Sequence, residues 1–129
     1  MDRRQLTDTI VFGFADIYDR VHKAGFEAAQ HDGRYSHRLF NGLELPFLLA
    51  SRELGENWLC TIPTEKLKGL YDAVNLALES NVEGGISFLN TAFNDPNRAG
   101  TKITLEEKEK IKPVANLTRV LKEYRDIQN

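Results

Sequence analysis

The densest group of reactive side chains lies between residues 31 and 38. The run reads His31-Asp32-Gly33-Arg34-Tyr35-Ser36-His37-Arg38. Guanidinium groups bind carboxylates and phosphates through paired hydrogen bonds, and imidazole exchanges protons near neutral pH. The sequence therefore offers Arg34, Tyr35, His37 and Arg38 as binding residues for an anionic ligand or an acidic protein surface. The alternative interpretation is a solvated link between two helices, in which Ser36 caps the second helix.

A second basic stretch spans residues 94 to 102 and adds Arg98 and Lys102 as candidate binding residues. Glycine in such a loop lets neighbouring backbone amides point toward one anion, and the two cations would add charge there. The stretch lacks the G-x-x-x-x-G-K-[ST] spacing of a phosphate-binding loop. A plain turn between helices is the favoured interpretation of it.

The sequence contains no motif typical of catalysis or metal binding. Neither E-x-x-H nor H-E-x-x-H occurs, and G-x-S-x-G and G-x-G-x-x-G are also missing. The pairs Glu27 with His31 and Asp19 with His22 have helical spacing but supply only two ligands each. Cys60 is the single cysteine and has apolar neighbours, where a thiol usually behaves as a small hydrophobe. We therefore expect no catalytic residue, no metal site and no cofactor.

Trp58 is a further candidate binding residue, because tryptophan is enriched at the centres of protein interfaces. Tryptophan also anchors small cores, and core packing is the favoured interpretation here, as it is for most of the seven phenylalanines. The chain carries 17 Lys plus Arg against 19 Asp plus Glu, a net charge of −2. Nucleic-acid-binding domains are usually basic, so this balance argues against nucleic acid as a partner.

The first long element is predicted from apolar residues three or four positions apart. They are Leu6, Ile10, Phe14, Ile17, Val21, Ala24 and Ala28. Such spacing places them on one face of a helix, for which Thr7 and Asp8 are candidate caps and Gly33 a natural stop. Asp16 with Arg20 and Asp19 with Lys23 have the spacing of ion pairs along this helix. Further apolar residues lie off the stripe, namely Val11, Phe12, Tyr18 and Phe26, so we expect this helix to contact partners on more than one side.

The segments that follow the first helix are predicted to form shorter helices. We expect a turn at residues 41–46, a buried helix at 45–54 with Pro46 in its first turn, and another helical turn within 36–41. An extended or short helical connector at 56–62 leads to a helix at 64–80 and a short one around 86–93.

The last helix begins at Thr104, which with Glu107 forms a capping-box pattern. Pro113 lies in its interior, where proline bends or breaks a helix. We therefore expect two pieces meeting at an angle, as either a kinked helix or two helices.

These patterns predict an all-α fold in which residues 1–129 form a single domain. Five or six helices pack around the long N-terminal helix, with mostly antiparallel neighbours. No apolar run is long enough for a signal peptide or a membrane span. The unpaired cysteine suits a reducing compartment, so we expect a cytoplasmic protein.

The leading functional hypothesis is a small, non-enzymatic interaction protein, such as a regulator, inhibitor or adaptor. Its apolar and aromatic residues exceed what one helical stripe needs, and excess surface of this kind often forms a contact with another protein or a homodimer. The alternative is a helical domain that binds or processes a phosphorylated or other anionic small molecule through the 31–38 loop.

Overall fold

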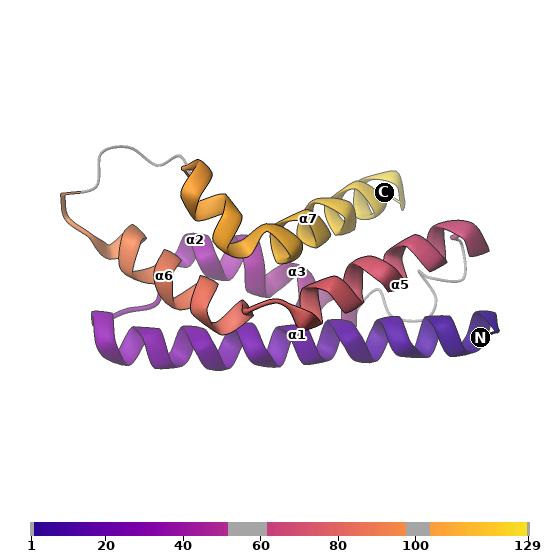
Figure 1. Cartoon of the computed structure of the whole chain (residues 1–129), viewed down its shortest axis with the longest axis horizontal. Coiled ribbons are helices and arrows are strands. Elements are labelled where there is room, and N and C mark those ends of the chain that lie inside the picture. The colour runs from indigo at the N-terminus through magenta and orange to yellow at the C-terminus, as the bar shows by residue number, and fades with distance from the viewer. Residues whose placement is uncertain (1, 52–61, 98–103, 129) are drawn as a thin grey trace.

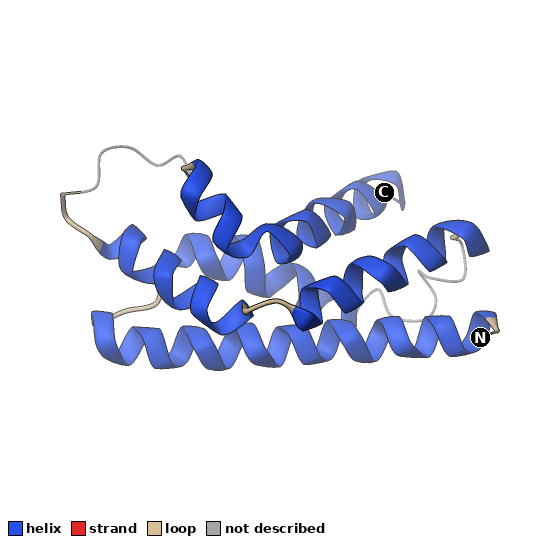
Figure 2. Ribbon diagram, in the orientation of Figure 1, coloured by secondary structure: helices blue, strands red, loops and turns tan. Residues whose placement is uncertain are grey.

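The computed structural model describes residues 2–51, 62–97 and 104–128, and all the regular elements within them are helical. In chain order they are α1 (Arg3–Asp32), α2 (His37–Leu39), the π-helical turn η1 (Phe40–Glu44), α3 (Leu45–Leu49), α5 (Thr64–Glu79), α6 (Val82–Asn94) and α7 (Leu105–Gln128). Figure 2 shows no strand in the described part of the chain. The prediction of an all-α bundle around a long N-terminal helix is confirmed.

Helix α1 runs along the whole length of the bundle, and the other helices lie on one side of it (Figure 1). All seven residues of the predicted apolar stripe are 5% exposed or less. They pack against α3, η1, α5 and α6. The helix passes through Gly13 without a break. A Cβ at this position would strike Val74 of α5, so glycine allows the two helices to approach closely.

The N-terminus of α1 is capped earlier than the sequence suggested. The Asp2 carboxylate accepts a hydrogen bond from the Gln5 backbone N–H at 2.8 Å, and the Gln5 side chain accepts one from the Asp2 N–H at 2.8 Å. This reciprocal pair is a capping box. The expectation that Thr7 and Asp8 form the cap is therefore wrong, because both lie inside the helix and the Thr7 hydroxyl donates to a backbone carbonyl.

The chain reverses direction after α1 and returns along it. Gly33 ends the helix with a φ of 88°, in the left-handed region that favours glycine. Residues 37–51 then form one continuous helical segment rather than the expected turn and helix. Its π-helical turn, in which the Leu45 N–H bonds the Phe40 carbonyl, directly precedes Pro46. The wider turn accommodates a residue that has no N–H to donate.

Helices α5 and α6 run parallel to α1, contrary to the expectation of mostly antiparallel neighbours. At one end of the bundle Arg3 donates to the Thr64 hydroxyl at 3.0 Å, and at the other end Asn90 donates to Asp32 at 3.0 Å. The two helices follow one another along α1 (Figure 1). The expected connector at 56–62 and the end of the expected helix at 45–54 lie largely outside the described residues.

Helix α6 begins at Val82, earlier than the apolar spacing indicated, with Asn81 as its N-cap. Its Gly85 lies against α7, because a Cβ there would approach the Lys110 carbonyl oxygen to 2.7 Å. Gly85 thus allows a close crossing of α6 and α7.

Helix α7 begins with the predicted capping box. The Thr104 N–H donates to the Glu107 carboxylate at 3.1 Å, and the Glu107 N–H donates to the Thr104 hydroxyl at 3.2 Å. Pro113 lies inside the helix, which bends visibly after its first turns (Figure 1). The prediction of a kink is confirmed, and the helix continues beyond the proline.

Candidate functional site

The 31–38 loop is held in place by the end of α6. The buried Asn90 side chain accepts a hydrogen bond from the Ser36 backbone N–H at 2.8 Å. Its amide group donates to the Asp32 carboxylate at 3.0 Å and to the Arg34 carbonyl at 3.1 Å. Thr91 donates a further hydrogen bond to Asp32 at 3.0 Å. In these contacts the polar groups of the loop find hydrogen-bond partners in α6, as expected for a link between helices.

The predicted binding residues of this loop are placed differently from one another. Arg34 is exposed and donates from Nε to Asn94 at 3.3 Å, and His37 is exposed at the start of α2. Arg38 is described in its backbone alone. The remaining predicted binding residues, Trp58, Arg98 and Lys102, lie outside the described residues. The structure therefore brings Arg34 to Asn94, the first residue of the second basic stretch.

Tyr35 points into the protein. Its ring packs on Gly25, where an added Cβ would lie 2.5 Å from a ring carbon. The hydroxyl is buried and has no hydrogen-bond partner among the described residues. Burial, with the negative charge of Glu44 as a second cause, raises the pKa of the Tyr35 hydroxyl well above its usual value. Tyr35 thus contributes to the interior of the bundle.

Glu44 and His22 form a pair that the sequence reading missed. Glu44 is 2% exposed, and its carboxylate lies 2.5 Å from Nδ1 of His22. The imidazole, 59% exposed, also stacks on Tyr18 with ring centroids 5.7 Å apart. A buried carboxylate and an aromatic neighbour fix the orientation of an otherwise exposed ring. The available signal was one acidic residue within the apolar run Gly42-Leu43-Glu44-Leu45-Pro46.

Arg20 joins α1 to the junction of α5 and α6, and its main partner is Glu83. The expected partner Asp16 acts only as a smaller electrostatic cause that raises the pKa of Arg20. Arg20 forms a two-pronged ion pair with Glu83 at 2.7 and 2.9 Å and donates to the carbonyls of Leu78 and Ser80. The Arg20 hydrogen bond lowers the pKa of Glu83, and the same bond raises the pKa of Arg20. The C-terminal carbonyls of α5 are thereby satisfied by a side chain from another helix.

A groove of about 600 Å³ lies between the start of α6 and the bend of α7. Gly84 and Phe88 line it on one side, and Lys110 and Pro113 on the other. The Lys110 ammonium lies 5.5 Å from the centre of the Phe88 ring. This cation–π contact covers part of the aromatic surface, so Phe88 is only 37% exposed.

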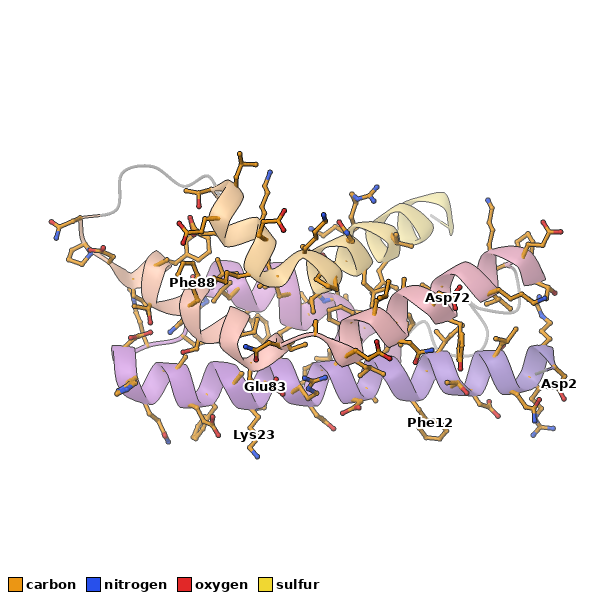
Figure 3. All side chains as sticks on the ribbon, viewed as in Figure 1. Asp2, Phe12, Lys23, Asp72, Glu83 and Phe88 are labelled. Carbon is orange, nitrogen blue, oxygen red and sulfur yellow. The ribbon has the colours of Figure 1, made fainter. Side chains whose placement is uncertain are left out.

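Among the described side chains, the most exposed aromatic ones lie on α1. Phe12 is 74% exposed and Phe26 is 62% exposed. They are two heptads apart and therefore share a side of the helix, opposite its buried stripe. Figure 3 shows Phe12 and Lys23 projecting away from the bundle on that side. The same side, which we name the outer face of α1, comprises Phe12, Ala15, Asp16, Asp19, His22, Lys23, Phe26 and Ala29.

Within the described ranges, no three His, Cys, Asp or Glu side chains gather in a way that could hold a metal ion. Nor is any helix there both long enough and apolar enough to cross a membrane. Comparison of the chain with models of protein families, with curated proteins and with solved structures gave no match.

Proposed function

We propose that this chain is an interaction protein, such as a regulator, inhibitor or adaptor, that binds another protein through the outer face of α1. The observation that carries the proposal is the pair Phe12 and Phe26, both largely exposed and placed by helical spacing on one side of α1. Figure 3 shows that Phe12 lies on the side that faces away from the bundle. Removing one phenylalanine side chain from water contributes about 1.5–3 kcal/mol. Burial of two such side chains on one helix face would contribute substantially to the free energy of binding.

The outer face has the form that a partner helix fits. Phe12 and Phe26 are separated by about 21 Å along the axis, at 1.5 Å per residue. Exposed charged residues lie between them, and small half-buried alanines flank them. Aromatic anchors with charges around them are typical of protein interfaces, where the anchors supply affinity and the charges select the partner.

The scaffold supports this use of the helix. The opposite side of α1 packs against α3, α5 and α6, and the helix is capped at both ends. The outer face is therefore presented on a rigid element, which lowers the entropy lost on binding. We propose the cytoplasm as its compartment, which the single unpaired cysteine supports.

The test is photo-cross-linking from the proposed face. A benzophenone amino acid is placed at position 12, at position 26 or, as the control, at exposed Asp72 on α5. Each variant is irradiated as pure protein and in an extract of the cells that make it. We expect cross-linked adducts from positions 12 and 26 and none from position 72. Adducts from position 72 alone, or from none of the three, would contradict the proposal.

A second candidate is an anion site at the 31–38 loop, which the exposed side chains of Arg34 and His37 support. Titration with inorganic phosphate, followed by the amide resonances of residues 34–37, tests it. Saturable shifts that Arg34→Ala abolishes would support this site, and unchanged resonances would exclude it.

A further inference from the structure

The partner that the outer face fits is, we infer, a second copy of the same helix in antiparallel orientation. This inference rests on the proposed function and names the occupant of that same surface. It is carried by the order of residues along the face, which is complementary to its own reverse.

The seam of the outer face follows a heptad pattern. Phe12, Asp19 and Phe26 are seven residues apart, and Ala15, His22 and Ala29 form a second set three residues further on. In a coiled coil these two sets are the core positions, and the residues that flank them set the orientation of the partner.

Antiparallel pairing about a twofold axis between residues 20 and 21 brings unlike residues together at each layer. Phe12 of one copy lies over Ala29 of the other, and Phe26 lies over Ala15. A large side chain thus meets a small one at both ends of the seam, which lets the helices approach closely. Every contact occurs twice because the interface is self-complementary.

The charges favour the same orientation. Asp19 meets His22 at the central layers, and Asp16 lies across the seam from Lys23, so each acid faces a basic residue of the other copy. All four side chains are exposed in the single chain. The Nδ1 contact with buried Glu44 holds the His22 ring at this face. Parallel pairing would instead place Asp19 of one copy against Asp19 of the other, and such a like-charge contact disfavours association.

The experiment is sedimentation equilibrium of the full chain at about 1–500 µM, the range in which a small two-helix interface dissociates. We expect a monomer–dimer equilibrium. Phe12→Ser with Phe26→Ser should weaken dimerisation by about 100-fold or more. Leu76→Ser on α5, where the side chain is 61% exposed, is the matched apolar control and should change nothing.

Charge exchange tests the orientation. Asp16→Lys and Lys23→Asp should each weaken the dimer about tenfold, and the double variant should restore it to within about threefold. Asp72→Lys is the matched charge-reversal control on α5. Circular dichroism is the control for folding, and each variant should keep its helix content because the substituted positions are exposed.

Cysteine pairing gives a second measure of orientation. In a Cys60→Ser background, Phe12→Cys with Ala29→Cys should form intermolecular disulfides on mild oxidation, whereas Phe12→Cys alone should not. A disulfide requires Cα atoms within about 7 Å, which the antiparallel dimer meets for 12 with 29 but not for 12 with 12.

A chain that stays monomeric at all concentrations would overturn the inference, and so would a dimer that survives loss of both phenylalanines. Adducts from positions 12 and 26 to a different protein, with the pure chain monomeric, would overturn the second copy as occupant and leave the proposed function standing. Absence of adducts from both positions 12 and 26 would contradict the proposed function as well as this inference.

Discussion

Two buried polar groups of the interior, the Glu44 carboxylate and the Tyr35 hydroxyl, differ in whether they have a hydrogen-bond partner. The Glu44 carboxylate has His22 as a hydrogen-bond partner, while the Tyr35 hydroxyl has none among the described residues. A buried group that loses its partner costs free energy, whereas removing a group that has no partner costs little. Substitution of each residue should therefore have a different effect on stability.

His22→Ala should lower the free energy of unfolding at neutral pH by about 1–3 kcal/mol, because it leaves a buried carboxylate without its partner. Gln30→Ala, at an exposed position of the same helix, should change it by less than about 0.5 kcal/mol. Urea denaturation measures both. In a Glu44→Gln background the His22→Ala effect should shrink, and an equal effect in both backgrounds would argue against the pair.

Tyr35→Phe should leave the stability unchanged or raise it by up to about 1 kcal/mol, since it removes a buried donor that has no acceptor. Tyr35→Ala should be destabilising by about 3 kcal/mol, because it empties the space over Gly25. Thermal unfolding compares the two variants. A loss of more than about 1 kcal/mol in Tyr35→Phe would show that the hydroxyl makes a bond important for stability.

At this scale the sequence predicted what periodicity can encode. The buried stripe of α1 follows directly from helical spacing, and every member is buried. The partners of His22 and Arg20 could not be predicted in this way, because each lies on an element distant in sequence. The exposure of Phe12 and Phe26 was likewise undecided, since apolar residues off the main stripe serve equally for core or for interface.

Among the helices, close approach depends on glycine at the crossing points. Gly85→Ala should lower the free energy of unfolding by about 1–3 kcal/mol, because the new methyl group meets the backbone of Lys110. Gly69→Ala, in α5 with open space around it, should instead raise stability by about 0.5–1 kcal/mol through helix propensity. Chemical denaturation gives both values. Equal effects of the two substitutions would contradict the close crossing of α6 and α7.

The link between α1 and the α5–α6 junction should depend on pH. Arg20 lowers the pKa of Glu83 in the folded protein, so the pair stabilises the fold above the ordinary glutamate value of 4.5. That stability is lost as pH falls through the lowered folded value. Glu83→Gln should therefore be less stable than wild type at pH 7, by about 0.2–1 kcal/mol because the pair is partly exposed. The difference should vanish in strong acid, and a difference that grows with acidification would contradict this assignment.

Element types followed from the sequence better than their arrangement did. The capping box at Thr104 and the bend of the proline-containing helix α7 are local features, and both were predicted correctly. The parallel course of α5 and α6 was not, because it depends on contacts between residues far apart in sequence, such as Arg3 with Thr64 and Asp32 with Asn90. The continuous segment at 37–51 was also missed, since a π-helical turn ahead of Pro46 has no simple sequence signal.

In the whole molecule, helix α1 has two roles. Its inner side supplies a large part of the core, and its outer face carries the exposed phenylalanines and the charges between them. The 31–38 loop, which first suggested a binding site, contributes to structure, since Asn90 and Thr91 hold it against α6.

The most direct test of the outer face as the binding surface is a dilution series of ¹⁵N-labelled protein followed by amide resonances. We expect concentration-dependent shifts at Phe12, Ala15, Asp19, His22 and Phe26, with the resonances around Phe88 and Lys110 unchanged. Shifts centred on the α6–α7 groove, with the α1 resonances constant, would contradict the account.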